Sequence, residues 1–392
     1  MTPARLNPRR PQRAAHPWIF TGEVASLPDD AADGHVVRVH DARGRFYATA
    51  YLNRRSKIVL RVLSWQDEPI DADFWRRRVR DALSLRGAFE PTAGRRLINA
   101  DGDRLPGLIV DYYAGWLVVQ ISTLGMDRMR AAIVEALREV VQPRGIYERS
   151  DVPERTLEGL ELRTGSLFGP DPPEFVEIVE GPARLLVDIA HGQKTGLFLD
   201  QRLNRQAAAS YARDRRVLNC FAYSGGFSVH AALAGAREVI SIDISADANR
   251  LAERNLALNG FPQSPVIEAN CFDWLRAASD RDERFGMIVL DPPAFARSRS
   301  ALDNALRGYK EINLRALKLL EPEGILVSCS CSRPITRDAF ATLIADAARD
   351  AGRDLQLLED RGQPPDHPVL LAASETNYLK CVILRADGTR PA

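Results

Sequence analysis

Two side chains in this sequence have the chemistry that a covalent reaction needs, and each follows an apolar run. Asp291 begins the sequence DPPAF (291–295), and Cys331 stands at the centre of SCS (330–332). Because proline removes a backbone donor and fixes φ, the proline pair ends a strand and holds the Asp291 carboxylate rigidly. A thiolate with a cation such as Arg333 nearby can add to an electrophilic carbon, so Cys331 is a candidate nucleophile. Alternatively, the DPP sequence only terminates a strand, and Cys331 is a small buried hydrophobic residue.

These groups fit chemistry on a flipped pyrimidine ring. Asp291 would accept hydrogen bonds from the polar edge of the ring. The apolar surface for the ring would come from Pro292, Pro293 and Phe295. Cytosine C5 is too weak a nucleophile to attack a methyl sulfonium unaided, and a thiolate added at C6 makes C5 enamine-like. Cys329 shares the side of an extended strand with Cys331, so the spacing leaves the choice of sulfur open.

The stretch from Val217 to Asp243 predicts the fold that would position these groups. An apolar run gives way to the turn Tyr223-Ser224-Gly225-Gly226, apolar residues then recur at helical spacing, and a second apolar run ends in Asp243. Glycines let a ligand approach the backbone, and an acid that ends the second strand can accept both hydroxyls of a ribose. The alternative is a tight turn that serves only the α/β unit.

The ligand predicted for this turn carries no phosphate. The turn has only two adjacent glycines and no GxGxxG fingerprint, so a pyrophosphate cradle is poorly supported. S-adenosylmethionine, which has a ribose but no phosphate, fits better. For the same reason a nicotinamide dehydrogenase is a distant alternative.

From about Val187 onward, strand and helix patterns alternate regularly. Two final strands are expected near LQLLED (355–360) and NYLKCVILRA (377–386). The alternation predicts an α/β fold with a mostly parallel, doubly wound sheet and an antiparallel edge. Ligands of such sheets bind at the carboxyl ends of the strands, where Asp243, Asp291 and Cys331 are expected.

The beginning of the chain has a different character. Short β-rich runs separated by turn signals between residues 16 and 64 predict a small barrel. Residues 1–62 hold eleven Lys or Arg against five acids, which indicates a polyanion partner, with a solvated arginine surface as the alternative. The residues suited to phosphate contact and base stacking are Arg9, Arg10, His16, Trp18, Arg54 and Arg55. Trp18 could instead fill the barrel core.

Residues 71–186 predict an α+β module. The pattern of residues 71–88 is that of a helix with Phe74, Val79 and Leu83 on one side. Two strands joined by a short turn are expected within 104–123, followed by a helix at 126–141 and further strands.

Composition excludes several classes of protein. The chain has 392 residues, of which 45% are hydrophobic and 27% charged, with a formal net charge of +1. No apolar run reaches the roughly 20 residues of a membrane span, and the N-terminus lacks the apolar core of a signal peptide, so we expect a cytoplasmic protein. The five cysteines include no CxxC pair, so neither a disulfide framework nor a metal site is indicated.

These residues resemble a known family, the PUA domain-containing class I S-adenosylmethionine-dependent methyltransferases that form 5-methylcytosine in large-subunit (23S) ribosomal RNA. The resemblance spans nearly the whole chain. Its matching segments are HPWIF (16–20), LPGLIVDYY (105–113), YERSD (147–151), GQKTGLFLDQR (192–202), NCFAYSGGFS (219–228), DPPAF, SCS and DHPV (366–369). Many methyltransferases share DPP and the Gly-Gly turn, whereas GQKTGLFLDQR together with SCS and the PUA start is specific.

The resemblance implies three domains: a PUA-like RNA-binding barrel at 1–70, an α+β domain at 71–186, and a Rossmann-like methyltransferase domain with a seven-stranded sheet at 187–392. It also implies that Cys331 is the nucleophile and that Asp291 binds the N3/N4 edge of cytosine. The S-adenosylmethionine-binding residues it implies are Gln193, Lys194, Thr195, Phe198, Asp200, Tyr223, Ser224, Gly225, Gly226, Asp243, Asn270 and Asp291. Asn270 stands where the family usually has Asp, and its carbonyl can still accept from adenine.

The resemblance further implies an RNA partner, either 23S ribosomal RNA or its assembly intermediate, and a homodimer. The composition indicates no membrane partner. The base that removes the C5 proton stays open, because Asp366 and His367 are matched only through DHPV. Two alternatives remain. One is an RNA methyltransferase that acts on an exocyclic nitrogen and needs no thiolate, and the other is a noncatalytic RNA-binding or ribosome assembly factor.

Overall fold

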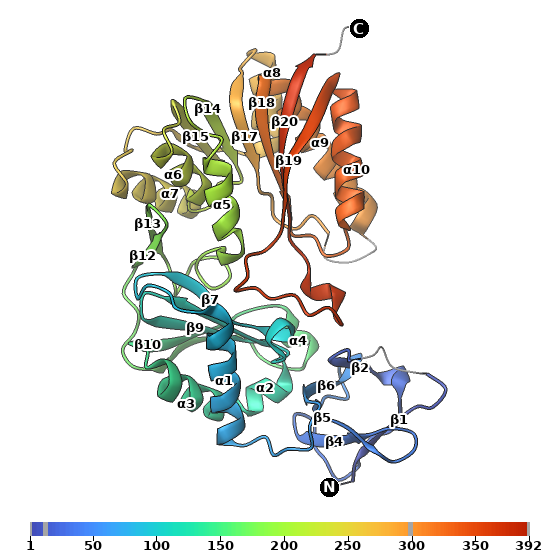
Figure 1. Cartoon of the computed structure of the whole chain (residues 1–392). Coiled ribbons are helices and arrows are strands. Elements are labelled where there is room, and N and C mark those ends of the chain that lie inside the picture. The colour runs from blue at the N-terminus through green and yellow to red at the C-terminus, as the bar shows by residue number, and fades with distance from the viewer. Residues whose placement is uncertain (1, 11–14, 297–300, 390–392) are drawn as a thin grey trace. The chain divides into compact units, whose positions relative to one another are not determined.

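The computed structural model describes residues 2–10, 15–296 and 301–389, which form two compact units (Figure 1). The N-terminal unit holds the described residues up to Ile178, with Val187–Leu199 and Pro365–Thr376. The C-terminal unit holds Val179–Leu186, Asp200–Pro364 and the described residues from Asn377 onward. The division into domains at 1–70, 71–186 and 187–392 stays a prediction, and the structure groups 187–199 with the N-terminal unit.

The N-terminal unit begins with a six-stranded sheet of order β2-β6-β5-β4-β1-β3. Its pairs are antiparallel except β1 with β4, which are parallel. Ile19, Val39, Ala50 and Leu60 are among the buried residues of its separate core. The predicted small β-rich module is thereby confirmed. Its strands are β1 (Ala4–Leu6), β2 (Trp18–Phe20), β3 (Val24–Ser26), β4 (Val36–His40), β5 (Phe46–Leu52) and β6 (Ile58–Ser64).

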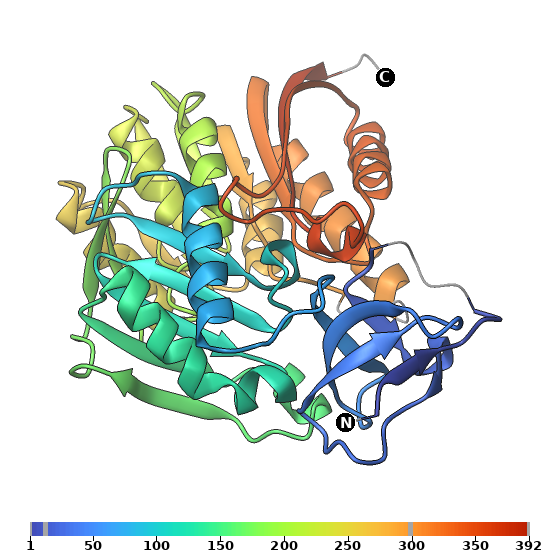
Figure 2. The same ribbon diagram turned by 60° about the horizontal axis from the view of Figure 1, so that its bottom comes forward.

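A second sheet in the N-terminal unit has five strands in the order β11-β10-β9-β8-β7. Figure 2 shows α1 and α3, which pack against each other, lying along this sheet. The elements are α1 (Ala72–Arg86), β7 (Gly94–Asn99), β8 (Leu108–Tyr113), β9 (Trp116–Ile121), α2 (Leu124–Arg128), α3 (Arg130–Val141), β10 (Gly145–Ser150), α4 (Glu154–Leu157) and β11 (Arg163–Phe168). The predicted α+β module is confirmed, with the helix expected at 126–141 divided into α2 and α3 at Met129.

The C-terminal unit contains a seven-stranded sheet of order β16-β15-β14-β17-β18-β20-β19. The pairs among β14 to β18 are parallel, and β20 runs antiparallel to both β18 and β19. This confirms the doubly wound sheet with an antiparallel edge. The strands are β14 (Arg216–Cys220), β15 (Glu238–Asp243), β16 (Val266–Glu268), β17 (Phe285–Leu290), β18 (Leu320–Ser330), β19 (Arg353–Arg361) and β20 (Lys380–Thr389), and the hairpin β12 (Val176–Glu180) with β13 (Ala183–Val187) precedes them.

Helices cover both faces of the seven-stranded sheet (Figure 1). Leu218 and Leu326 point to the face packed by α8 to α10, whereas Val217 and Val327 point to the face packed by α5 and α6, as strand alternation requires. The helices are α5 (Arg202–Ala209), α6 (Gly226–Leu233), α7 (Ala246–Leu258), α8 (Cys271–Asp280), α9 (Leu302–Leu319) and α10 (Arg337–Asp350). No helix in the described ranges is long and apolar enough to cross a membrane.

The amphipathic pattern of α1 gives a test of the N-terminal unit. Asp71 caps α1 by accepting from the Phe74 amide, and Phe74 is buried in the core of the five-stranded sheet. We expect Phe74→Ala to lower the free energy of unfolding by about 3 to 5 kcal/mol, because it removes a large buried ring. Leu85→Ala on the same helix, where the side chain is 67% exposed, should change it by less than about 0.5 kcal/mol. Denaturant titration of the full chain would check this, and equal effects of the two substitutions would contradict it.

Candidate active site

The order of the seven-stranded sheet brings the predicted site residues of the C-terminal unit to one edge. Asp243 ends β15, Asp291 follows β17, Cys331 follows β18, and Asn270 comes two residues after β16. The turn 221–225 follows β14, which lies between β15 and β17. Because these five strands are parallel, their carboxyl ends meet at the same edge, as the sequence predicts.

The turn after β14 has a strained backbone. Phe221, Tyr223 and Gly225 have φ values of 60°, 48° and 75°, in the left-handed region. A Cβ on Gly225 would lie 3.0 Å from Cβ of Ala252, and a Cβ on Gly226 would lie 2.8 Å from Cδ of Arg205. Close packing inside the protein accounts for glycine at both positions, and the approach of a ligand to this turn stays a prediction.

The Asp243 carboxylate joins the end of β15 to this turn. Oδ2 of Asp243 accepts from the Tyr223 amide and Oδ1 from the Ser245 amide, both at 2.9 Å. Each oxygen has a second lone pair, so the carboxylate can still accept from the hydroxyls of a ribose. Asn270 is placed in a similar way, since its Oδ1 accepts from the Phe272 amide at 2.9 Å and caps α8.

A buried ionic cluster packs behind the turn, and sequence reasoning missed it. The guanidinium of Arg205 donates to both carboxylate oxygens of Glu180 at 2.6 and 2.7 Å, and Nε2 of His230 lies 3.0 Å from Oε1 of Glu180. Burial raises the pKa of Glu180, but the charge and hydrogen bonds of Arg205 and the bond to His230 outweigh it and hold this pKa at about 2. These residues come from separate elements, so no local pattern reveals them.

Asp291 is held by a side chain as well as by the proline pair. Nε2 of Gln201 donates to Oδ1 of Asp291 at 2.8 Å, and Nδ2 of Asn204 donates to Oε1 of Gln201 at 2.6 Å. Gln201 belongs to the GQKTGLFLDQR segment but was not among the predicted site residues. Its neighbour Asp200, which was predicted, accepts at Oδ2 from the hydroxyl of Tyr378 at 2.7 Å.

Phe295 lies in a cluster of aromatic rings. Its ring centroid is 4.5 Å from that of Tyr309, 5.9 Å from that of Phe272 and 6.5 Å from that of Phe221. Phe295 is half-buried, so part of its ring surface remains accessible. Of the two prolines before it, Pro292 is buried and Pro293 is exposed.

Cys331 differs from the other cysteines in its exposure. Cys331 is partly exposed, whereas the four other cysteines are buried. Cys329 pairs in register with Cys381 inside the core, and that neighbouring thiol together with burial raises the pKa of Cys329 well above its usual value. Cys331 is therefore the more accessible of the two candidate cysteines, and Cys329 packs in the core.

Ser332 of SCS attaches this segment to the residue that follows DPPAF. Oγ of Ser332 accepts from the Ala296 amide at 3.3 Å and lies 3.1 Å from the hydroxyl of Tyr309. Oγ of Ser330 accepts from the Ser332 amide at 3.4 Å. Two segments far apart in the sequence are thus fixed to each other beside Asp291 and Cys331.

The predicted cofactor residues Gln193 to Phe198 lie in the N-terminal unit. Oγ1 of Thr195 donates to Oδ2 of Asp111 at 2.6 Å, and the guanidinium of Arg96 donates to the same carboxylate at 2.8 and 2.9 Å. Arg149 donates to the carbonyls of Ile189 and Gly192, both at 2.9 Å. Asp111 and Arg149 come from LPGLIVDYY and YERSD, so these segments hold the backbone around the predicted cofactor residues.

Within that segment, Nζ of Lys194 lies 4.4 Å from the centroid of the Phe198 ring. The contact of Gln193, Lys194, Thr195 and Phe198 with a cofactor stays a prediction. Asp366 and His367 of the DHPV sequence also lie in the N-terminal unit, both buried, with Nδ1 of His367 3.1 Å from Oδ1 of Asp366.

The predicted RNA-binding residues have different environments. Arg9, Arg10, Arg54 and Arg55 are exposed, and Arg54 pairs with Asp33 at 2.7 Å. His16 and Trp18 instead have partners inside the protein. His16 is 3% exposed, and its Nδ1 accepts from the Trp18 amide. Nε1 of Trp18 donates to Oδ1 of Asp101 at 2.8 Å. His16 therefore offers no surface to RNA, and Trp18 offers only the part of its ring that is not buried.

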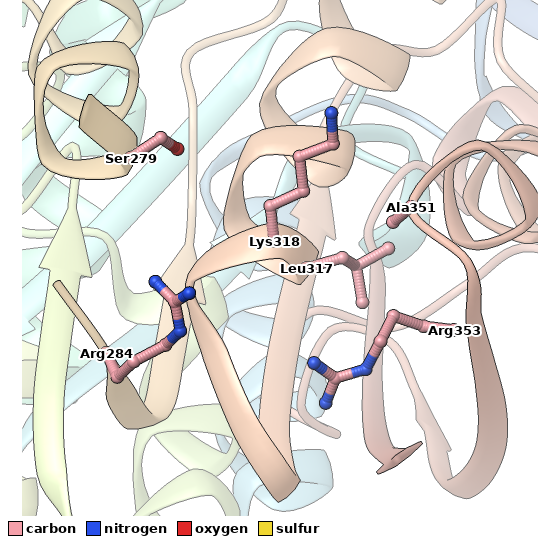
Figure 3. Close-up of a pocket in the computed structure, with 6 residues that line it drawn as sticks. All are labelled: Ser279, Arg284, Leu317, Lys318, Ala351 and Arg353. Carbon is pink, nitrogen blue, oxygen red and sulfur yellow. The ribbon is translucent and has the colours of Figure 1, made fainter. Parts of the chain in front are cut away.

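A cavity of about 340 Å³ lies at the other edge of the seven-stranded sheet (Figure 3). Its lining residues are Ser279, Arg284, Leu317, Lys318, Ala351 and Arg353. Arg284 immediately precedes β17 and Arg353 begins β19, so the cavity faces the amino ends of these strands. The Arg353 guanidinium donates to the carbonyls of Leu320, Glu321 and Asp387 and joins adjacent strands, which is a structural role.

Comparison with known proteins defines the class. Residues 163–385 match the family described as S-adenosylmethionine-dependent methyltransferase, and residues 6–65 match a PUA-like domain. The chain therefore belongs to the S-adenosylmethionine-dependent methyltransferase family, and S-adenosylmethionine is its cofactor.

Within this family the chain is similar to proteins named Ribosomal RNA large subunit methyltransferase I. The protein of that name from Aeromonas hydrophila is 43% identical over 378 residues, which cover 95% of each chain. The one from Erwinia tasmaniensis is 43% identical over 374 residues, covering 93% of this chain and 94% of the relative. A Streptococcus mutans structure assigned as a SAM-dependent methyltransferase has a TM-score of 0.83 at 23% identity, covering 98% and 100% of the two chains, and shows that the fold is shared.

The residues at the strand ends fit S-adenosylmethionine. The carboxylate of Asp243 and the amide carbonyl of Asn270 are acceptors suited to the ribose hydroxyls and the adenine amine, and each has lone pairs beyond its capping bond. Phe221 and Phe272 are half-buried rings near these acceptors, and their centroids are 6.4 Å apart.

The ionic cluster behind the turn gives a pH prediction. The pKa of Glu180 is lowered in the folded state, so its ionised form contributes stability that is complete above its ordinary value of about 4.5 and is lost as the pH falls toward about 2. We expect Glu180→Gln to leave Arg205 uncompensated and to lower the free energy of unfolding at neutral pH by about 3 to 5 kcal/mol. Unfolding titrations at several pH values would measure this.

The exposed Glu177 on the same strand β12 provides a control. Glu177→Gln should retain the wild-type acid dependence between about pH 4.5 and pH 2, whereas Glu180→Gln should lose the part of it that the lowered pKa of Glu180 contributes. Identical acid profiles for wild type and Glu180→Gln would show that the cluster does not stabilise the fold.

Proposed function

We propose that this chain transfers the methyl group of S-adenosylmethionine to C5 of a cytosine in large-subunit ribosomal RNA, through a covalent bond between Cys331 and C6. The relatives' name supports ribosomal RNA as the substrate. The observation that carries the choice of atom is the partly exposed thiol of Cys331 at the end of β18, next to the strand β17 that ends before Asp291. Methyl transfer to an exocyclic nitrogen would need no such thiol.

The cofactor would be held at the carboxyl ends of β14, β15 and β16. Asp243 would accept from the ribose, Asn270 from the adenine edge, and the turn Tyr223–Gly226 would support the methionine part. When bound, S-adenosylmethionine would supply the methyl group that C5 of the base receives, and its positively charged sulfur would leave as a neutral thioether.

The protein's own groups would act on the cytosine. Sγ of Cys331, as a thiolate, forms a bond to C6, and the electrons of the C5–C6 double bond become available at C5. Asp291, fixed by Gln201, hydrogen-bonds the N3/N4 edge. After C5 is methylated, a base removes its proton, the double bond re-forms and the S–C6 bond breaks, which restores the thiolate. The family resemblance offers Asp366 and His367 as candidates for this base.

The exposed cations of the PUA-like domain would bind the RNA. Arg9, Arg10, Arg54 and Arg55 project basic groups to solvent, and Trp18 presents part of its ring. Guanidinium groups on such a surface bind phosphates with little sequence preference, so this domain would supply affinity and orientation.

Cys331→Ala tests the covalent mechanism. We expect the rate of methyl transfer to 23S ribosomal RNA to fall by about 10³-fold or more, because no other group supplies the nucleophile, while the Kd for S-adenosylmethionine measured by calorimetry stays close to the wild-type value. Cys329→Ala is the matched control, since its sulfur lies in the core, and it should retain most of the activity. Full turnover by Cys331→Ala would exclude covalent catalysis at this residue and favour a nitrogen target.

The RNA surface has a separate test. Replacing Arg9 and Arg10 by Ala should weaken binding of 23S ribosomal RNA. It should also make the slope of the logarithm of the binding constant against the logarithm of the salt concentration shallower by up to about two, which is about one for each phosphate that a guanidinium no longer neutralises. Arg38→Ala provides the control, because Arg38 is an exposed cation of the same sheet that pairs with Asp67. An unchanged salt slope in the double variant would remove Arg9 and Arg10 from the RNA surface.

A further inference from the structure

Lys380 is a buried cation next to the candidate nucleophile, and nothing in the sequence pattern distinguishes it. It is the first residue of β20, pairs in register with Ser330 and is 4% exposed. Its ammonium donates to the carbonyls of Ser332 and Tyr378, both at 2.8 Å. One of these carbonyls belongs to the residue that directly follows Cys331.

The partners of Lys380 satisfy its hydrogen bonds but do not balance its charge. Across the described ranges, Lys380 forms no ion pair with a carboxylate, and its two acceptors are neutral carbonyls. A buried ammonium without a counter-charge is unfavourable, because burial removes it from water. A thiolate at Cys331 would supply the missing negative charge.

The electrostatics of the surrounding groups agree with this pairing. Burial lowers the pKa of Lys380 to about 8, whereas the interaction with Cys331 raises it and that with Arg337 lowers it. Arg337 forms an ion pair with Asp360, and Arg333 is exposed. From α9, Tyr309 faces the same sulfur, and burial is the main reason why its pKa rises to about 12, so it stays neutral.

We propose that Lys380 is a positioning residue whose ammonium stabilises the thiolate form of Cys331 and fixes the turn that carries it. The stabilisation is mutual, because the attraction between the ammonium and the thiolate favours both charged forms by the same amount. The three hydrogens of the ammonium allow a further interaction beyond its two carbonyl bonds.

This inference rests on the proposed function for the role of Cys331, but its test does not depend on methyl transfer. Full-length protein is treated with iodoacetamide from about pH 5 to about pH 10, a range that includes ordinary thiol pKa values, and alkylation of the peptide containing Cys331 is followed by mass spectrometry. We expect the wild-type rate to reach half its maximum below about pH 8.5, the usual value for a cysteine.

Lys380→Met should move this midpoint upward by about one unit or more, so that alkylation near pH 7 becomes about tenfold slower. Lys380→Arg, which keeps the charge, should stay close to wild type. A Lys380→Met profile identical to that of the wild type would overturn the proposal. If circular dichroism shows that Lys380→Met does not fold, the wild-type profile decides, because a midpoint at or above the ordinary value overturns the proposal.

The proposed function adds a second readout. If Cys331 is the nucleophile, Lys380→Met should lower kcat for RNA methylation about tenfold near pH 7, with KM for S-adenosylmethionine little changed, and the loss should diminish at higher pH. Turnover by Cys331→Ala would overturn the proposed function while the alkylation profiles still decide the role of Lys380. The two failures are therefore distinguishable.

Discussion

The parallel pairing of β17 with β18 is the constraint on which the candidate site depends. The register aligns Leu290 with Ser328, so the DPPAF and SCS segments leave the sheet at the same edge. Both strands are largely buried, and a one-residue slip would turn each core side chain to the opposite face. The bond from the Ala296 amide to Ser332 then joins the two segments directly. Core packing thus determines that the cysteine lies beside the aspartate.

Buried charges shape this edge in two different ways. Glu180 and Arg205 form a buried ion pair, and their contribution is positional, because a buried ion pair gains little over a well-packed apolar pair. Cδ of Arg205 would lie 2.8 Å from a Cβ at Gly226, so a larger residue at the start of α6 would have to displace the Arg205 side chain. Lys380, by contrast, has only neutral acceptors, and its charge remains available to act on a neighbour. The first arrangement supports a backbone conformation, and the second supports a reactive group.

Periodicity and turn chemistry predicted the sheet well because most of its strands are buried on both faces and read as apolar runs. The same reasoning missed β7, whose sequence GRRLIN mixes charged and apolar residues without clear alternation. It also missed Gln201, Glu180 and Lys380, whose functions depend on partners distant in the sequence. The two glycines illustrate this limit: the turn was predicted in the right place, but their packing against Ala252 and Arg205 could not be read from the local sequence. Local sequence thus predicts elements, whereas the partners of polar side chains require the folded chain.

The cation beside Cys331 shows why nearness in the sequence is a poor guide to electrostatics. Arg333 is two residues from the sulfur, but it is exposed, and water and salt weaken the field of an exposed charge. Lys380 reaches the same segment from the antiparallel strand β20 and is buried, where the lower effective dielectric strengthens its interaction. Because β20 is antiparallel, it starts at the carboxyl edge of the parallel strands, and its first residue, Lys380, places a positive charge there. A parallel strand in its place would present its carboxyl end at this edge and would need a different loop to deliver the cation.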